Sequence, residues 1–298
     1  MIQVYGLGQC ALDHLALVPS YPEADTKCEF KDMIVQGGGP VATALVALSR
    51  WGISCAIAGV IGDDAFGGEI RRSLDEERVD TTGLVVRRGG GSQFAFIAVE
   101  AGTGKRTIFW RRPTGAALAS SELNHDLIRS AKVVHTDGLF IEASLAAART
   151  ARAAGVKVVV DAGTLRDGML ELAKESDCFV VSATFARALV GEDRPLEACR
   201  RLAELGPRVV GVTLGEGGYV ALDAGGMIER PAYRVQAMDT TGCGDVFHGG
   251  FIYGLIQGWD AARCLDFGAW AAARLSLRLG GRDGIPPLAD WPEQKLHA

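Results

Sequence analysis

The stretch Asp239-Thr240-Thr241-Gly242-Cys243-Gly244-Asp245 carries more information about the fold than any other part of the chain. Its two glycines stand directly before a long apolar pattern typical of a helix. They predict a tight turn whose bare backbone N–H groups lie at the positive end of the helix dipole, an arrangement that binds anions. A transferring phosphoryl group is the anion that we expect there. Asp245, just inside the helix, is then placed to accept a proton from an approaching hydroxyl group.

A simpler interpretation of the same residues needs no ligand. In it, Asp245 is an N-terminal carboxylate that stabilises the helix dipole, and the glycines only make the turn. The motif alone leaves both interpretations open.

The rest of the chain shows short β-rich apolar runs alternating with helical patterns, which predicts βαβ units and a mostly parallel sheet. We expect strands over 2–7, 55–61, 132–136, 156–161, 178–182 and 208–214, and helices over 39–50, 65–77, 121–131, 142–154 and 195–205. The prediction is an α/β fold with a doubly wound sheet and helices on both faces, as one domain over residues 1–298.

Two segments, about 15–35 and 93–111, break this rhythm. The first contains two prolines and an alternating stretch, and the second reads as two alternating strands around the turn 101–104. We expect them to form one small antiparallel sheet inserted in the domain. Such a sheet needs a ligand or a partner subunit to cover its second face, which predicts a substrate lid and a homodimer through that lid. The alternative is a hairpin without function.

Composition excludes several classes of protein. The net charge of −5 argues against an electrostatic nucleic-acid binder, which needs a basic face. The seven cysteines are scattered and form no C-x-x-C pair, which fits neither a disulfide framework nor a zinc site. The N-terminus lacks a basic segment, and no apolar run approaches the length of a membrane span. We therefore expect a cytoplasmic protein that is not bound to a membrane and holds no structural metal ion.

The motif at 239–245 resembles the second signature of the PfkB-type (ribokinase-like) carbohydrate kinases, which usually reads D-T-x-G-A-G-D. Gln36-Gly37-Gly38-Gly39-Pro40 resembles the N-terminal double-glycine signature of the same family. The resemblance extends over essentially the whole chain. It implies a doubly wound sheet with a β-lid and ATP-dependent phosphorylation of a sugar hydroxyl, with Mg²⁺ arriving with ATP.

The resemblance also assigns roles to individual residues. It implies that Asp245 is the general base, that the amides of Gly242, Cys243 and Gly244 form the anion hole, and that Asp13, near the end of an N-terminal strand, binds substrate hydroxyls. The resemblance also implies roles for residues that match the family or stand where it has a functional residue. On the substrate side these are Gly37, Gly38, Gly39 and Thr43. On the nucleotide side they are Thr213, Gly215, Gly218 and Thr241. Asp239 and Thr241, near Gly280 and Gly281, resemble a loop that binds a monovalent cation such as K⁺ in some relatives.

Two departures from the family pattern are visible. Ala42 or Thr43 stands where the family commonly has an asparagine, so one substrate contact is missing or replaced. The family's N-x-x-E segment, whose glutamate helps organise magnesium, reads Ser182-Ala183-Thr184-Phe185. Metal handling must therefore be arranged differently.

Within the family, the glycine signatures look most like the sulfofructose kinase branch, and Lys27 falls where that branch has a lid lysine. The branch's sulfonate-binding asparagine and arginine cannot be placed. Four lid cations could bind an anionic group of the substrate, because guanidinium groups suit carboxylate, phosphate or sulfonate; the alternative is that they are solvated. They are Lys27, Arg106, Arg111 and Arg112. Trp110 could stack on a sugar or lie in a dimer interface.

Two other functions deserve weight. Gly6-Leu7-Gly8-Gln9-Cys10-Ala11 imitates a dinucleotide fingerprint and would indicate an NAD-binding oxidoreductase, but the residues after it do not look helical. The second function is a non-catalytic protein of the same fold that only binds a nucleotide or a sugar. Such a protein would need no base, so the presence of Asp245 together with Gly242 and Gly244 argues against it. Within the enzymes of this fold, a nucleoside kinase is the main alternative.

Overall fold

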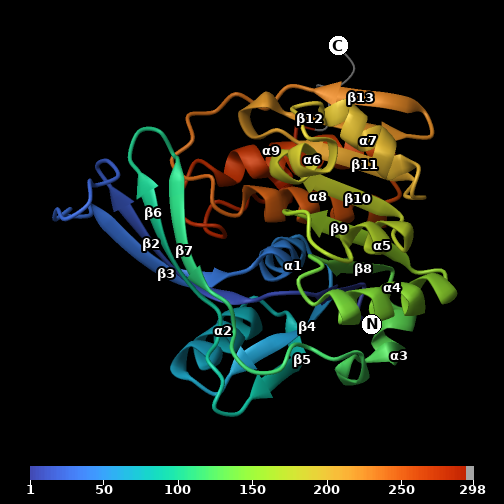
Figure 1. Cartoon of the computed structure of the whole chain (residues 1–298), viewed down its shortest axis with the longest axis horizontal. Helices are drawn as coiled ribbons and strands as arrows, with labels where there is room; N and C mark the ends of the chain where they lie inside the picture. The colour runs from blue at the N-terminus through green and yellow to red at the C-terminus, as the bar shows by residue number, and fades with distance from the viewer. Residues whose placement is uncertain (293–298) are drawn as a thin grey trace.

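The computed structural model describes residues 1–292 and shows a nine-stranded main sheet (Figure 1). Its strand order is β13-β12-β11-β10-β9-β8-β1-β4-β5, and pairing is parallel from β5 to β11 and antiparallel in β12 and β13. The chain adds strands on either side of β1, so the predicted doubly wound sheet is confirmed. The strands are β1 Val4–Leu7, β4 Cys55–Gly62, β5 Asp80–Arg87, β8 Val133–Thr136, β9 Lys157–Ala162, β10 Cys178–Ser182, β11 Val209–Thr213, β12 Tyr219–Asp223 and β13 Gly226–Arg230.

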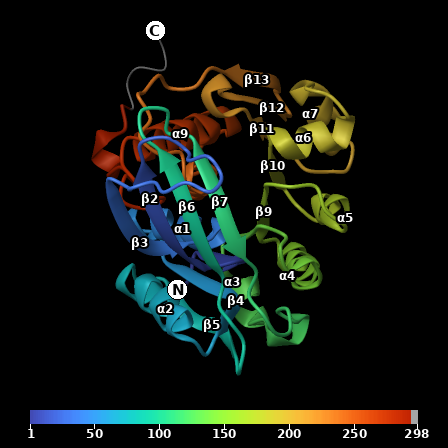
Figure 2. The same cartoon turned by 60° about the vertical axis from the view of Figure 1, so that its left-hand side comes forward.

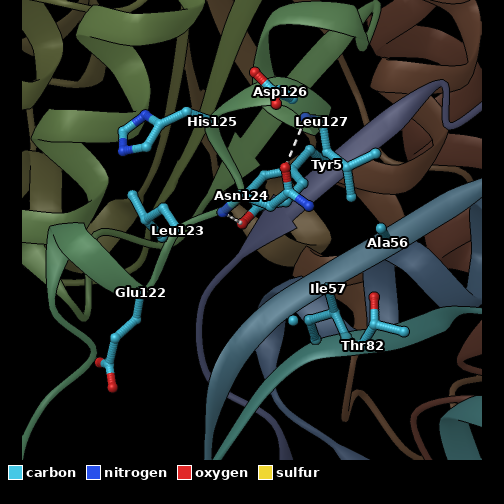
Figure 3. A pocket seen from close by; sticks show the side chains of 11 residues that line it. Tyr5, Ala56, Ile57, Thr82, Glu122, Leu123, Asn124, His125, Asp126 and Leu127 are labelled. Atoms are coloured by element: carbon cyan, nitrogen blue, oxygen red, sulfur yellow. Dashed lines mark hydrogen bonds between the residues drawn. The ribbon is translucent and has the colours of Figure 1, made fainter.

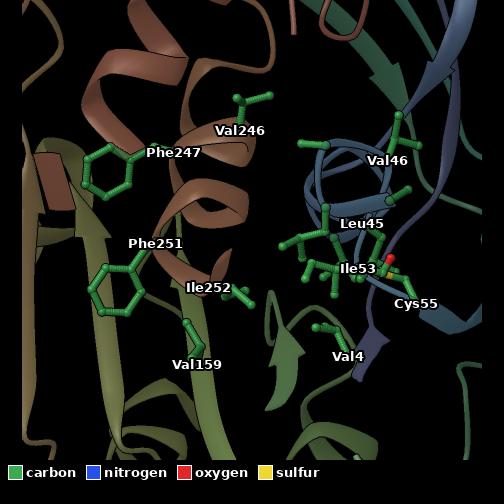
Figure 4. Close-up of a cluster of buried hydrophobic side chains, with 14 of the residues drawn as sticks. Val4, Leu45, Val46, Ile53, Cys55, Val159, Val246, Phe247, Phe251 and Ile252 are labelled. Carbon is green, nitrogen blue, oxygen red and sulfur yellow. The ribbon is translucent and has the colours of Figure 1, made fainter. Parts of the chain in front are cut away.

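Helices cover both faces of this sheet and divide the core in two. Buried side chains of α1, α2, α8 and α9 pack on one face, where Leu45, Phe247 and Phe251 belong to one apolar cluster (Figure 4). Those of α3 to α7 pack on the other. The helices are α1 Pro40–Arg50, α2 Ala65–Glu76, α3 His125–Ser130, α4 Ile141–Ala153, α5 Met169–Lys174, α6 Ala183–Val190, α7 Pro195–Ala203, α8 Cys243–Ile256 and α9 Ala261–Leu275, with short 3₁₀ turns at Ser120–Glu122, Gly215–Gly217 and Leu288–Asp290. No helix within residues 1–292 is long and apolar enough to cross a bilayer.

The expected strands and helices are all present within a few residues of their predicted ends. The helices α5 and α6 were not predicted. Both are short, and α6 follows β10 without any intervening loop residue, so that Ser182 is both the last strand residue and the N-cap that accepts from the Phe185 amide at 3.1 Å. The apolar pattern of such a short helix merges with that of the strand before it.

A second sheet of four strands, the lid, has the order β3-β2-β6-β7. Its strands are β2 Ala11–Val18, β3 Asp32–Gly38, β6 Phe94–Glu100 and β7 Arg106–Arg111. It stands apart from the main sheet at the left of Figure 1 and comes to the front in Figure 2. The expectation of an antiparallel lid was wrong at its centre, because β2 and β6 pair in parallel. Two distant parts of the chain each supply an antiparallel pair, β2 with β3 and β6 with β7. The two pairs meet where β2 runs parallel to β6.

Strand register assigns the lid side chains to two faces. Cross-strand partners point to the same side of a sheet and alternate along each strand. Asp13 and Gln36 are partners, as are Ala95 and Trp110, Ile97 and Ile108, and Val99 and Arg106. This inner face packs through Leu15, Ile97 and Ile34 against Leu279 of the main domain. Met33, Val35, Phe96, Phe109 and Arg111 belong to the outer face.

Candidate active site

The 239–245 motif forms the predicted turn, and one carboxylate holds it in place. Asp239 is fully buried, and its Oδ1 accepts hydrogen bonds from the Thr241 amide at 2.8 Å and the Thr241 hydroxyl at 2.7 Å. Its Oδ2 accepts from the Gly280 amide at 2.8 Å. Gly242 adopts a left-handed conformation with φ of +75°, and a Cβ there would lie 2.7 Å from the Gly281 Cα. Only glycine suits this position.

The turn leaves backbone amides free at the start of α8. The Cys243 amide donates to the Thr240 carbonyl at 3.3 Å, whereas no acceptor within residues 1–292 is found for the amides of Gly242, Gly244 and Asp245. Gly244 is exposed, and nothing lies within 4 Å of where its Cβ would be. Free amides at a helix N-terminus can bind an anion. The sequence predicted the amides of Gly242, Cys243 and Gly244 for this role, whereas the structure leaves those of Gly242, Gly244 and Asp245 free.

Asp245 lies beside other carboxylates from three separate elements. Burial raises its pKa, to about 7, and the negative charges of Asp161, Asp13 and Asp137 add to that shift, while Arg106 opposes it. Asp161 is the last but one residue of strand β9, Asp137 directly follows β8, and Asp13 is in lid strand β2. A carboxyl group with such a pKa is poised to exchange protons near neutral pH.

His248 connects two of these groups. It is buried one helical turn after Gly244, and its Nδ1 lies 2.8 Å from the Gly244 carbonyl and 3.4 Å from Asp161 Oδ2. Its Nε2 lies 3.4 Å from the Val180 carbonyl. The imidazole thus holds the start of α8 against the ends of β9 and β10.

The double-glycine signature forms a surface directly against Asp13. A Cβ on Gly38 would collide with both oxygens of the Asp13 carboxylate, and one on Gly37 would collide with Arg282. Gly39 has φ of +97° and packs on the backbone of Gln9 and Cys10, where it begins α1. Asp13 lies within a lid strand and not at the end of the first strand, as had been expected.

A buried arginine supports this surface from below. Arg282 is 4% exposed, and its guanidinium group lies 3.5 Å from the Gly38 carbonyl and 3.5 Å from the Ser73 hydroxyl. Burial raises the pKa of Asp13 to about 6, and the positive charge of Arg282 limits that rise. The chain therefore buries a cation close to a buried carboxylate, which favours the ionised form of that carboxylate.

Asp137 and Arg166 extend the site along the strand ends. Asp137 accepts hydrogen bonds from the amides of Gln9 and Leu139, each at 2.9 Å, and burial raises its pKa to about 6. Arg166, in the loop after β9, donates to the Asp137 carbonyl at 3.1 Å, and its Nε is buried without a partner within the described residues. Neither residue was predicted from the sequence.

The sequence did hold a signal for Asp137 and Asp161. Each is a carboxylate at the C-terminal end of a predicted parallel strand, and these ends meet at one edge of the sheet, where ligands bind in open α/β folds. Arg282 follows two predicted glycines, but nothing local indicates that it reaches Gly38. Its partner is 244 residues away in the chain.

Three of the four predicted nucleotide-side residues lie together at the end of β11, whereas the fourth, Thr241, is in the turn before α8. Thr213 ends this strand, Gly215 has φ of +59° with open space around it, and Gly218 has φ of +89° against the Arg230 carbonyl. The turn also closes the β11–β12 hairpin, because the Leu214 amide donates to the Gly218 carbonyl at 2.8 Å. Thr43, on the substrate side, is buried within α1.

The predicted lid cations separate in space. Arg106 belongs to the inner face and donates to the Thr240 hydroxyl of the 239–245 turn. Arg112 continues the inner alternation just beyond β7, with its guanidinium carbon 5.0 Å from the centre of the Trp110 ring. Arg111 belongs to the outer face and lies near Gly91. Lys27 is exposed in the loop between β2 and β3.

The cysteine of the motif is a packed thiol. Cys243 Sγ lies 3.4 Å from the Ala272 carbonyl, and burial raises its pKa to about 12. It therefore stays protonated and acts as a small side chain, as the alanine of the family signature would.

The part of the chain that the structure describes holds no ready-made metal site. Where the family has N-x-x-E, Ser182 caps α6 and Phe185 is fully buried. No group of three or more acidic, histidine or cysteine side chains able to hold a metal ion occurs within residues 1–292. The free amides fit the phosphate oxygens of a triphosphate, so Mg²⁺ bound to that substrate is compatible with the site.

A cavity of about 470 Å³ lies elsewhere, between β1, β4, β5 and the start of α3 (Figure 3). Tyr5 accepts a hydrogen bond from the Asn124 amide at 3.4 Å there. Two carboxylates line the cavity, Glu122 and Asp126. Glu122 is held by Arg87 at 2.6 Å, which lowers the pKa of Glu122 to about 2. The cavity shares no residue with the carboxylate site and is not the reaction centre.

The free amides, the raised pKa of Asp245 and the lid together define a phosphotransferase that acts on an alcohol. The model of the pfkB family carbohydrate kinases matches residues 1–287, and the chain belongs to this family. It is an ATP-dependent carbohydrate kinase.

Relatives of known name agree with this assignment. The chain is 28% identical to an ATP-dependent ribose-1-phosphate kinase of Halopiger xanaduensis over 97% of this chain and 96% of the relative. It is also 28% identical to a ribokinase of Haemophilus influenzae, over 98% of each chain. A putative ribokinase from Agrobacterium tumefaciens has a similar solved structure, with a TM-score of 0.88 and 26% identity over 96% of this chain and 94% of that one. A sulfofructose kinase branch is not specifically indicated by these matches.

Replacing Gly38 by Ala will raise the KM for the sugar by at least about tenfold, because the added methyl group displaces the Asp13 carboxylate from its place. The KM for ATP and the melting temperature should change little. Gly68→Ala is the matched control, since nothing lies within 4 Å of its Cβ position in α2. If steady-state kinetics gave the same KM for the sugar in both variants, Gly38 would not belong to the sugar-binding surface.

Proposed function

We propose that this kinase transfers the γ-phosphoryl group of ATP to a hydroxyl, most simply a primary one, with Asp245 as general base. The observation that carries the proposal is the half-buried Asp245 carboxylate beside free helix N-terminal amides. Asp245 accepts the hydroxyl proton while the sugar oxygen bonds to the γ-phosphorus. The bond from that phosphorus to its bridging oxygen breaks, and ADP leaves. The free amides stabilise the negative charge of the transferring group.

Other residues of the site hold the two substrates in line. Asp13 and the backbone at Gly37 and Gly38 bind the sugar hydroxyls, and the turn from Thr213 to Gly218 admits the nucleotide. Mg²⁺ brought by ATP neutralises phosphate charge. Asp239 has hydrogen bonds to both oxygens; a monovalent cation such as K⁺ would have to use backbone carbonyl groups around it.

Replacing Asp245 by Asn will reduce turnover by about 10²- to 10⁴-fold, the usual contribution of a positioned base, while ATP binding measured by calorimetry persists. Asp126→Asn, an exposed carboxylate paired with Arg129, serves as control. In the wild type, kcat/KM should rise with pH through the raised pKa of Asp245, because only the ionised form accepts the proton. Full turnover in Asp245→Asn would remove the base from the mechanism.

The substrate carries an anionic group in our proposal, and Arg112 with Arg166 supports this. Burial lowers the pKa of Arg166, while the negative charges of Asp137 and Asp161 oppose that shift. The positive charge of Arg112 adds to the lowering, so the two guanidinium groups are near each other. Neither has a salt bridge to a carboxylate within residues 1–292. Two close cations that form no salt bridge within the described residues favour a bound phosphate, sulfonate or carboxylate.

Arg112→Gln will raise the KM for a sugar with an anionic group by at least about tenfold, and leave that of its neutral counterpart within about twofold. Ribose 1-phosphate and ribose make such a pair, and a panel of sugar acids, sulfosugars and nucleosides completes the screen. Arg111→Gln is the matched control, because the adjacent arginine lies on the outer face. Equal small effects in both variants would return Arg112 to the solvated surface, and preference for nucleosides would indicate the nucleoside kinase.

We also propose a homodimer through the outer face of the lid. Met33 and Val35 on edge strand β3 and Phe109 on the opposite edge strand β7 are apolar there yet 44%, 49% and 49% exposed. A second copy of the same sheet would cover them. Phe109→Lys should give a monomer in sedimentation velocity where the wild type is a dimer. A monomeric wild type at micromolar concentration would contradict this assembly.

A further inference from the structure

The hairpin joining β6 to β7 rests on the catalytic turn. A Cβ on Gly104, which is buried at the hairpin tip, would lie 3.0 Å from the Ala237 carbonyl oxygen. The Thr240 hydroxyl donates to the Gly104 carbonyl at 3.3 Å and accepts from Arg106 Nη1. The lid therefore touches the main domain at residues 237–240, directly before the free amides.

Arg106 is the lid cation that this contact brings to the reaction centre. The strand register puts Arg106 on the inner face, opposite Val99, which is fully buried in the contact with the main domain. Its neighbour Lys105 is exposed on the turn, and no salt bridge within residues 1–292 links Arg106 to a carboxylate. Among the residues that the structure describes, its guanidinium group has one hydrogen bond, to Thr240, and so retains further N–H donors for a ligand.

The carboxylate site needs such a cation. Asp13, Asp137, Asp161 and Asp245 face the same space, and a triphosphate adds further negative charge there. The positive charge of Arg106 is felt by Asp245 and by Cys243, at both ends of the first turn of α8.

From this geometry we infer that Arg106 is a catalytic residue supplied by the lid: when the hairpin rests on residues 237–240, its guanidinium group contacts the transferring phosphoryl group and neutralises its charge. This rests on the proposed phosphoryl transfer at Asp245. Closure of the lid and completion of the catalytic charge are then one event, so that the enzyme is fully active only with the hairpin closed. No bond is made or broken by Arg106, which acts through charge and hydrogen bonds alone.

Arg106→Gln tests this role. We expect kcat to fall by about 10²- to 10³-fold, the loss that follows removal of one donor to developing charge, with the KM for ATP changed by less than about fivefold. Arg106→Lys should recover part of the loss because it keeps the charge. Lys105→Gln is the matched control on the same hairpin and should behave as the wild type.

Two further measurements separate catalysis from a merely structural contact. Thr240→Val removes the hydroxyl that holds the hairpin and keeps the charge of Arg106, so its kcat should fall only a few-fold. The acid limb of kcat/KM should move to higher pH in Arg106→Gln, because the cation that lowers the pKa of Asp245 is gone while Asp13, Asp137, Asp161 and His248 remain around it. Equal losses in both variants, with no shift of the limb, would make Arg106 a latch and overturn the inference.

The two proposals can fail separately. If Asp245→Asn had no turnover while Arg106→Gln turned over as the wild type does, the role of Arg106 would be rejected and the proposed base would stand. Full turnover in Asp245→Asn would reject the base, and with it the inference.

Discussion

The three hydrogen bonds of the buried Asp239 carboxylate join the parts of the site. Two of them close the turn around Thr241, and the third reaches Gly280 on a loop 41 residues later. That loop packs against Gln36 and Ile34 of the lid through Gly280, and places Arg282 under Gly38. The 239–245 turn and the double-glycine surface, to which we assign phosphoryl and sugar binding in our proposal, are therefore attached to one another through a single carboxylate. An apolar residue at 239 would leave the Gly280 and Thr241 amides buried without acceptors.

Several features of the fold and site were predictable because their signals are local. Period-two and helical patterns located the main strands and helices, and the two glycines before an apolar run predicted the turn at 239–245. The turn was predictable in particular because Gly242 has a conformation and a neighbour, Gly281, that exclude a side chain. The apolar alternation of the lid segments was equally visible.

The parts that were missed depend on pairing between distant segments. Sequence spacing made Arg111 and Arg112 equivalent candidates, and only the register of β6 with β7 puts them on opposite faces. The parallel pairing of β2 with β6 left no trace in either segment, since alternation is the same in parallel and antiparallel strands. Arg282 and Arg166 act through backbone carbonyls that no local pattern identifies.

The parallel junction in the lid also has a consequence for the order of folding. Leu12 pairs with Phe94, so the middle of the lid cannot form by hairpin closure. The intervening chain builds α1, β4, α2 and β5, and these must come together before β6 is delivered beside β2. Such a pairing incurs the entropy of a long loop before it gains any contact, which places it late on the folding path. A nascent chain released before about residue 100 would expose β2 as an unpaired edge, a surface prone to association with other chains.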